Sequence, residues 1–125
     1  MLTFCKGKIH RATVTDANLN YIGSVTIDEN LVNYAGLYAG QLVKINNIRN
    51  GISWETYIVK GQAGKGEIIL NGPPAHHFQK GDIVIILGYV QIDQKEAQDS
   101  HPTTVFVDGQ NKITEVKKGN IRPTD

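Results

Sequence analysis

Few residues of this chain stand at the spacings that common enzymes use. Gly61 and Gly66 have the separation of the first and last glycines of a phosphate-binding loop. Glu67 and Ile68 then occupy the places where lysine and serine or threonine would bind phosphate and magnesium. A glycine-rich hairpin is therefore the favoured interpretation of this segment.

The histidines and serines also lack the usual catalytic patterns. The four histidines include no pair at the spacing of a helical zinc motif, and the adjacent His76 and His77 are expected to point apart. No Gly-x-Ser-x-Gly element is present to form the nucleophile turn of a serine hydrolase. We expect no metal site and no ordinary hydrolase.

Two short patterns remain as candidates for a functional site, the pair Lys8 and His10 and the dipeptide Gly23-Ser24. Lys8 and His10 lie two apart on a predicted strand and so face the same side, although a solvated polar edge is the commoner situation for such a pair. Gly23-Ser24 stands at a predicted strand entrance, where glycine before serine usually marks only a turn.

Composition limits the partners and the compartment. The 125 residues include 13 Lys or Arg and 12 Asp or Glu, so the formal charge of +1 gives no electrostatic footprint for nucleic acid or an anionic membrane. The longest apolar runs, such as 83–87, are too short to span a bilayer, and the first residues lack the order of a secretory signal. A single cysteine, Cys5, cannot form an internal disulfide, which favours a reducing, cytoplasmic location.

The elements that must position these residues are mostly strands. Short β-branched runs alternate with turn residues, a pattern typical of a compact β-barrel or sandwich with little helix. We expect strands over residues 2–14, 24–27, 42–48, 54–59, 67–71, 83–91, 103–107 and 113–116.

Turn and capping residues separate these strands. Asn50-Gly51 predicts a tight hairpin. Asp28 is expected to cap a helix that runs to about Ala35 and ends at Gly36, and a weaker helical stretch is predicted over 94–98. We expect one domain over 1–116 and a flexible polar tail over 117–125.

The segment 8–28, KIHRATVTDANLNYIGSVTID, resembles the start of the bacterial aspartate 1-decarboxylases. The resemblance continues in Asn50-Gly51, Thr56-Tyr57, Asn71-Gly72 and GDIVII at 81–86, and covers about residues 1–116. It implies a mainly β fold, a double-psi β-barrel with one or two short helices, assembled as a homotetramer with active sites between subunits. It also implies conversion of L-aspartate to β-alanine and carbon dioxide for pantothenate synthesis.

The resemblance further implies that the cofactor is a covalent pyruvoyl group made from Ser24. In the family the serine hydroxyl attacks the preceding glycine carbonyl, the chain is cleaved between Gly23 and Ser24, and the serine becomes a ketone. That ketone condenses with the substrate amine and accepts the electrons released when carbon dioxide leaves. Glycine at 23 can adopt a strained or left-handed conformation that opens its carbonyl to attack.

Further roles follow from the same resemblance. Tyr57 matches the tyrosine that returns a proton to the decarboxylated intermediate. Lys8 matches the lysine that binds a substrate carboxylate, and Thr56 a threonine of self-processing and substrate contact. Because adjacent strand residues point to opposite faces, Thr56 and Tyr57 can serve one pocket only through a bulge, a twist or a backbone contact. The other implied site residues are His10 and Tyr21 as pocket walls, Asn71 as a supporting residue, and Gly72, Pro73 and Pro74 as a substrate-binding loop.

Two departures from the family pattern bear on the substrate. Ser53 stands where members typically carry an arginine that grips a carboxylate, and Arg49 or Arg11 is a candidate replacement. Pro73-Pro74 replaces small residues and removes two backbone donors. These departures motivate two alternatives: a non-catalytic β-barrel paralogue with a binding or regulatory role, and a decarboxylase of another small amino acid.

Overall fold

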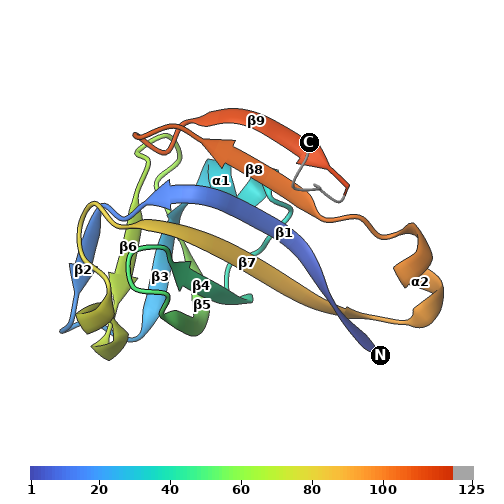
Figure 1. The fold of residues 1–125 in the computed structure, drawn as a ribbon, viewed down its shortest axis with the longest axis horizontal. Coiled ribbons are helices and arrows are strands. Elements are labelled where there is room, and N and C mark those ends of the chain that lie inside the picture. The colour runs from blue at the N-terminus through green and yellow to red at the C-terminus, as the bar shows by residue number, and fades with distance from the viewer. Residues whose placement is uncertain (120–125) are drawn as a thin grey trace.

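A computed structural model describes residues 1–119 of the chain and shows a mainly β architecture (Figure 1). Its strands are β1 (Leu2–Thr13), β2 (Asp16–Asn18), β3 (Ser24–Asp28), β4 (Leu42–Asn47), β5 (Ser53–Gly61), β6 (Ile68–Asn71), β7 (Ile83–Ile92), β8 (Thr103–Val107) and β9 (Ile113–Lys118). Its helices are α1 (Glu29–Tyr34), the short 3₁₀ helix η1 (Pro73–His77) and α2 (Gln94–Asp99).

The strands pair in the order β2-β6-β3-β5-β4-β7-β1-β8-β9. Most neighbours are antiparallel, but β1–β8, β2–β6 and β3–β5 are parallel, so the chain must cross over between them. In Figure 1 the long strands β1 and β7 run side by side, with α2 at one end of the molecule. The predicted mainly β fold class with one or two short helices is confirmed, since the structure has nine strands and two short α-helices within residues 1–119.

The core is built from alternate residues of the strands. Ile9, Ile27, Ile45, Ile58 and Ile86 each come from a different strand and are fully or almost fully buried. Their neighbours along each strand are more exposed, as expected when one face of a sheet covers a core. This alternation decides which side chains of the candidate site share a face.

The local signals that predicted the helices are present in the structure. The Asp28 carboxylate accepts a hydrogen bond from Asn30 N at 2.8 Å and caps α1, while Gly36 follows the helix with φ of 72°. The Asp93 carboxylate caps α2 in the same way through Glu96 N. The Asn50-Gly51 hairpin is also confirmed, since it joins the antiparallel strands β4 and β5 with Gly51 at φ of 71°.

The glycine-rich segment 61–66 binds an internal carboxylate. Asp28 accepts hydrogen bonds from Gly66 N at 2.7 Å and from Gly64 N at 3.1 Å, in addition to its helix cap. The backbone donors that would hold phosphate in a nucleotide loop are therefore satisfied from within the chain. This agrees with the interpretation of the segment as a structural hairpin.

Two elements were not predicted, and both lie beside the candidate site. The short strand β2 pairs with β6, and η1 begins immediately after Gly72. At the other end, β9 continues through Lys118, and residues 120–125 of the predicted tail lie outside the described residues. Among residues 1–119, no helix is long and apolar enough to cross a membrane.

Candidate functional site

Ser24 is the first residue of β3 and is buried, with 5% of its surface exposed. Its hydroxyl donates to Ile22 O at 3.2 Å and accepts from Asn71 Nδ2 at 3.1 Å. The antiparallel pairing of β3 with β6 places Ser24 opposite Asn71. The predicted nucleophile is thus held at the strand entrance, next to the Gly23–Ser24 bond that it would attack.

Near Ser24, the glycine with a left-handed backbone is Gly72. Its φ of 100° lies in the left-handed region, and a Cβ on it would come within 2.7 Å of Gly23 Cα. Gly23 itself does not have a left-handed φ, and a Cβ there would meet no atom within 4 Å. Of the strained or left-handed conformation expected for Gly23, the left-handed alternative is therefore wrong; the left-handed glycine is Gly72, which makes the close approach between the two loops.

Asn71 lies at the end of β6 and is as buried as Ser24. Its Nδ2 donates both to Ser24 Oγ, at 3.1 Å, and to Thr26 Oγ1, at 3.2 Å. Its Oδ1 is buried and has no hydrogen-bond partner in the described part of the chain. A buried acceptor without a partner is costly in a stable fold, so this amide is a candidate ligand-binding group.

Thr56 and Tyr57 lie on opposite faces of β5. The strand pairs with β3 and β4 without a register shift, so no bulge turns the two side chains to one side. Val25 pairs with Ile58 and both belong to the core, which puts Thr56 on the core face and Tyr57 on the outer face with Ser24. Tyr57 is 41% exposed, whereas Thr56 is 8% exposed.

Lys8 and His10 lie on β1, on the face opposite the buried Ile9. His10 packs edge-to-face against Phe106, with ring centroids 5.5 Å apart, and its Nδ1 is buried without a partner in the described residues. Burial lowers the pKa of His10, and the positive charges of Lys8 and Arg11 lower it further. Three strands, β5, β4 and β7, separate β1 from β3 in the sheet. The sheet pairing therefore does not place Lys8 beside Ser24.

The remaining predicted loop residues flank the predicted cleavage site between Gly23 and Ser24. Tyr21 is 63% exposed in the turn before Gly23. Pro73 and Pro74 occupy the first two positions of η1, where a helical N–H would lack an intrahelical acceptor in any case. Pro73 is exposed, and the side chain of Pro74 is outside the described part of the structure.

Ser53 and Arg49 lie at the turn between β4 and β5. The Ser53 hydroxyl is exposed and hydrogen-bonds Asn46 Oδ1. Arg49 forms a bidentate pair with Asp82, Nε to Oδ1 at 2.7 Å and Nη2 to Oδ2 at 3.0 Å. This hydrogen bonding lowers the pKa of Asp82 to about 2. Because its fork already holds a carboxylate, Arg49 is a poor replacement for the missing arginine. Arg11, which is exposed, remains a candidate.

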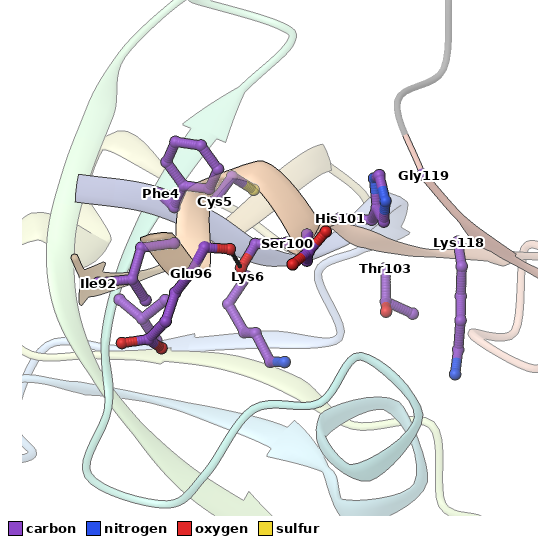
Figure 2. A pocket seen from close by; sticks show the side chains of 12 residues that line it. Phe4, Cys5, Lys6, Ile92, Glu96, Ser100, His101, Thr103, Lys118 and Gly119 are labelled. Carbon is purple, nitrogen blue, oxygen red and sulfur yellow. Dashed lines mark hydrogen bonds between the residues drawn. The ribbon is translucent and has the colours of Figure 1, made fainter. Parts of the chain in front are cut away.

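A cavity of about 710 Å³ lies away from these residues, between the start of β1, the end of β7 and α2 (Figure 2). Acidic and basic side chains line the cavity, and Ser100 Oγ, also in the lining, donates to Glu96 O at 2.8 Å. None of the predicted site residues lines it. Its lining includes Phe4, Cys5, Lys6, Glu96, Asp99 and Lys118.

Two polar residues with buried contacts were missed by the sequence analysis. Thr26 shares the Asn71 amide with Ser24, and its place two residues after Ser24 on one strand was the available signal. Asp82 was named only within the segment 81–86 of the family resemblance, since its side-chain partners Asn47 and Arg49 are distant in sequence. Within residues 1–119, no three His, Cys, Asp or Glu side chains are grouped as metal ligands.

Comparisons with known proteins give one consistent family. A family model described as aspartate decarboxylase matches residues 1–114. The chain is 51% identical over 118 residues to the aspartate 1-decarboxylase of Pelotomaculum thermopropionicum, covering 94% of this chain and 89% of that protein. It is also 51% identical over 120 residues to the enzyme of the same name from Carboxydothermus hydrogenoformans, covering 96% and 94%. The Neisseria meningitidis protein of that name is 50% identical over 114 residues, covering 91% and 90%.

Among solved structures, the chain is similar to a computationally designed protein named msDPBB_sym2. The TM-score is 0.44 at 19% sequence identity, covering 70% of this chain and 99% of the designed one.

Proposed function

Because this chain belongs to the aspartate decarboxylase family, we propose that it converts L-aspartate to β-alanine and carbon dioxide after cleaving itself between Gly23 and Ser24. The observation that carries the proposal is the buried Ser24 hydroxyl, which Asn71 Nδ2 contacts at 3.1 Å. The product then serves pantothenate synthesis.

The surroundings of Ser24 fit the formation of a covalent pyruvoyl group. Asn71 Nδ2 donates to Ser24 Oγ and directs the hydroxyl proton away toward Ile22 O, which leaves Oγ in a fixed position beside the Gly23–Ser24 bond. The unpartnered Asn71 Oδ1 offers an acceptor at the same place. The pyruvoyl group, once present, supplies a ketone that acts as an electron sink for decarboxylation.

The chain's own residues then have separate tasks. Tyr57 shares the outer face of the sheet with Ser24, one position before the paired residues Val25 and Ile58, and supplies the proton from its phenol. Lys8 binds a carboxylate of aspartate through its ammonium group. Thr56, on the core face, supports the strand that carries Tyr57, and this placement favours a role through the backbone over direct side-chain contact with Ser24.

We further propose a homotetramer in which neighbouring subunits complete each site. Leu42, Tyr57 and Val59 are exposed on one face of β4 and β5, and Tyr21 and Ile22 are exposed in the cleavage loop. Such apolar exposure favours burial against another subunit. The sheet order, which keeps β1 apart from β3, also supports a second copy as the source of Lys8. Light scattering at several concentrations tests this, and a stable monomer would contradict it.

Specific residues still support the two alternatives, a non-catalytic paralogue and a decarboxylase of another small amino acid. A non-catalytic paralogue is motivated by Ser53 in place of arginine and by Pro73-Pro74, and the same departures motivate a different amino-acid substrate. The engagement of Arg49 by Asp82 leaves Lys8 and Arg11 as the candidate cations for the second carboxylate of aspartate. With its free cysteine, the chain is expected in a reducing cytoplasm.

Intact-mass analysis of the purified, incubated protein tests the proposal. We expect two chains, 1–23 and 24–125, with a ketone replacing the amine at the start of the second, and a single intact chain for Ser24→Ala. A wild-type chain that stays uncleaved under activating conditions would contradict the catalytic proposal. Carbon dioxide release from aspartate, compared with glutamate and alanine, then separates the two enzymatic alternatives.

A further inference from the structure

Thr26 shares a hydrogen-bonding partner, Asn71, with Ser24 at the proposed cleavage site. It lies two residues after Ser24 on β3, so both hydroxyl groups face the same side of the strand. Asn71 faces that side from β6 and bridges them, with Nδ2 at 3.1 Å from Ser24 Oγ and 3.2 Å from Thr26 Oγ1. The two amide hydrogens of one asparagine thus have two hydroxyl acceptors.

The hydroxyl proton of Ser24 fixes which way this amide points. Because Ser24 Oγ donates to Ile22 O, it can only accept from Asn71, so the nitrogen and not the oxygen of the amide must face it. Asn71 Oδ1 is then left buried and free of protein partners in residues 1–119. Two hydrogen bonds therefore hold one unpartnered acceptor in a defined place.

Self-cleavage removes one of these two bonds. Ser24 Oγ attacks the Gly23 carbonyl carbon, the Gly23–Ser24 C–N bond breaks, and the hydroxyl proton passes to the released nitrogen, which gives an ester and an amine. Loss of the Ser24 α-proton then breaks the Cβ–Oγ bond, and Oγ leaves as part of the Gly23 carboxylate. Water hydrolyses the remaining enamine to the ketone and ammonia, so the ketone oxygen comes from water. In the mature chain, Thr26 Oγ1 is the one hydroxyl of this pair that remains.

We propose that Thr26 is a positioning residue of the mature enzyme, which keeps the Asn71 amide in its catalytic orientation after the Ser24 hydroxyl has gone. The inference rests on the proposed function. It assigns the two acceptors to different stages: Ser24 Oγ orients Asn71 before cleavage, and Thr26 Oγ1 orients it afterwards. Thr26 therefore contributes to turnover more than to self-cleavage.

The test compares Thr26→Val with Thr26→Ser in the full-length protein. Valine removes the hydroxyl and keeps the methyl group that packs near Gly61, while serine keeps the hydroxyl. Thr114→Val is the matched control, since Thr114 lies on β9, away from β3 and β6 in the sheet. Four quantities are measured: the half-time of cleavage, kcat and KM of the matured protein with aspartate, and the distance from Asn71 Nδ2 to the side chain of residue 26 in a crystal structure of the mature variant.

For Thr26→Val we expect cleavage within about twofold of wild type, a loss of kcat/KM of about tenfold, the size of one hydrogen bond, and an Asn71 amide turned away from residue 26. Thr26→Ser should restore the wild-type values to within about twofold. Unchanged turnover, an equal loss in cleavage and turnover, or a serine variant as impaired as valine would each overturn the inference while leaving the proposed function standing. A wild-type chain that never cleaves would overturn both.

Discussion

Two buried polar clusters, one around Asp82 and one around Asn71, differ in how many of their hydrogen bonds are formed. The Asp82 carboxylate, 5% exposed, accepts from Arg49 Nε and Nη2, from Asn47 Nδ2 at 2.8 Å and from Gln79 N at 2.9 Å. Asn71, equally buried, donates to two hydroxyl groups and leaves its Oδ1 without a partner in residues 1–119. The Asp82 cluster is therefore saturated with hydrogen bonds, whereas the Asn71 cluster keeps one acceptor unpaired.

This difference indicates a structural role for the Asp82 cluster and a ligand-binding role for Asn71. A buried polar group with all its bonds made contributes to stability, whereas an unmade bond costs about 1 to 3 kcal/mol. The Asp82 cluster ties the turn after β4 to η1, because Asn47 Nδ2 also donates to His77 O at 3.0 Å. Asn71, beside the proposed nucleophile Ser24, leaves a hydrogen bond unmade at a cost in stability, as expected of a group that binds a ligand.

The largest effect is expected for Asp82→Leu, which keeps the branched shape of the side chain and removes every acceptor. We expect a loss of about 3 kcal/mol in the free energy of unfolding, because the Asn47 amide and Gln79 N–H lose a buried partner and Arg49 loses its counter-charge. Urea unfolding at pH 7 measures this. Asp99→Leu, at an exposed position, is the control. A loss below 1 kcal/mol for Asp82→Leu would show that the saturated cluster is not structural.

Asn71→Leu should give the opposite result. Leucine has a similar branched shape and removes an acceptor that has no partner within residues 1–119, so the free energy of unfolding should change by less than about 1 kcal/mol. Self-cleavage should slow by roughly ten- to hundredfold, since Ser24 Oγ loses the donor that orients it. Unfolding is compared in a Ser24→Ala background, where every chain stays intact, and cleavage is followed by mass spectrometry. A large stability loss with normal cleavage would reverse the two assignments.

The same two clusters show what the sequence could predict. Local signals were sufficient for α1, where Asp28 caps the helix and Gly36 ends it, and for the Asn50-Gly51 hairpin. Asp82 was missed because its partner Arg49 is 33 residues away in sequence, and no local pattern indicates that pairing.

At the candidate site, Ser24, Asn71 and Tyr57 were named in advance from the family resemblance, and the sheet register places all three on one face. That register also has no bulge at Thr56 and Tyr57, so the two side chains stay on opposite faces, as adjacency on a regular strand predicts. Gly72, and not Gly23, has the left-handed backbone, because this depends on how two loops approach each other in space.

Acid should weaken the saturated cluster by a smaller, measurable amount. The pKa of Asp82 in the folded chain is about 2, below the ordinary value of 3.8, mainly because Arg49 hydrogen-bonds the charged form. Between these pH values the unfolded chain binds more protons at this position, so the stabilisation is complete above about pH 4 and is lost as the pH falls to about 2. Since Arg49 is half exposed and screened, we expect Asp82 to account for about 1 kcal/mol of that loss. The measurement is the difference in unfolding free energy between wild type and Asp82→Asn at pH 6, 4 and 2.5. A difference that stays constant over this range would mean that the charge of Asp82 does not stabilise the cluster and that its hydrogen bonds alone hold it together.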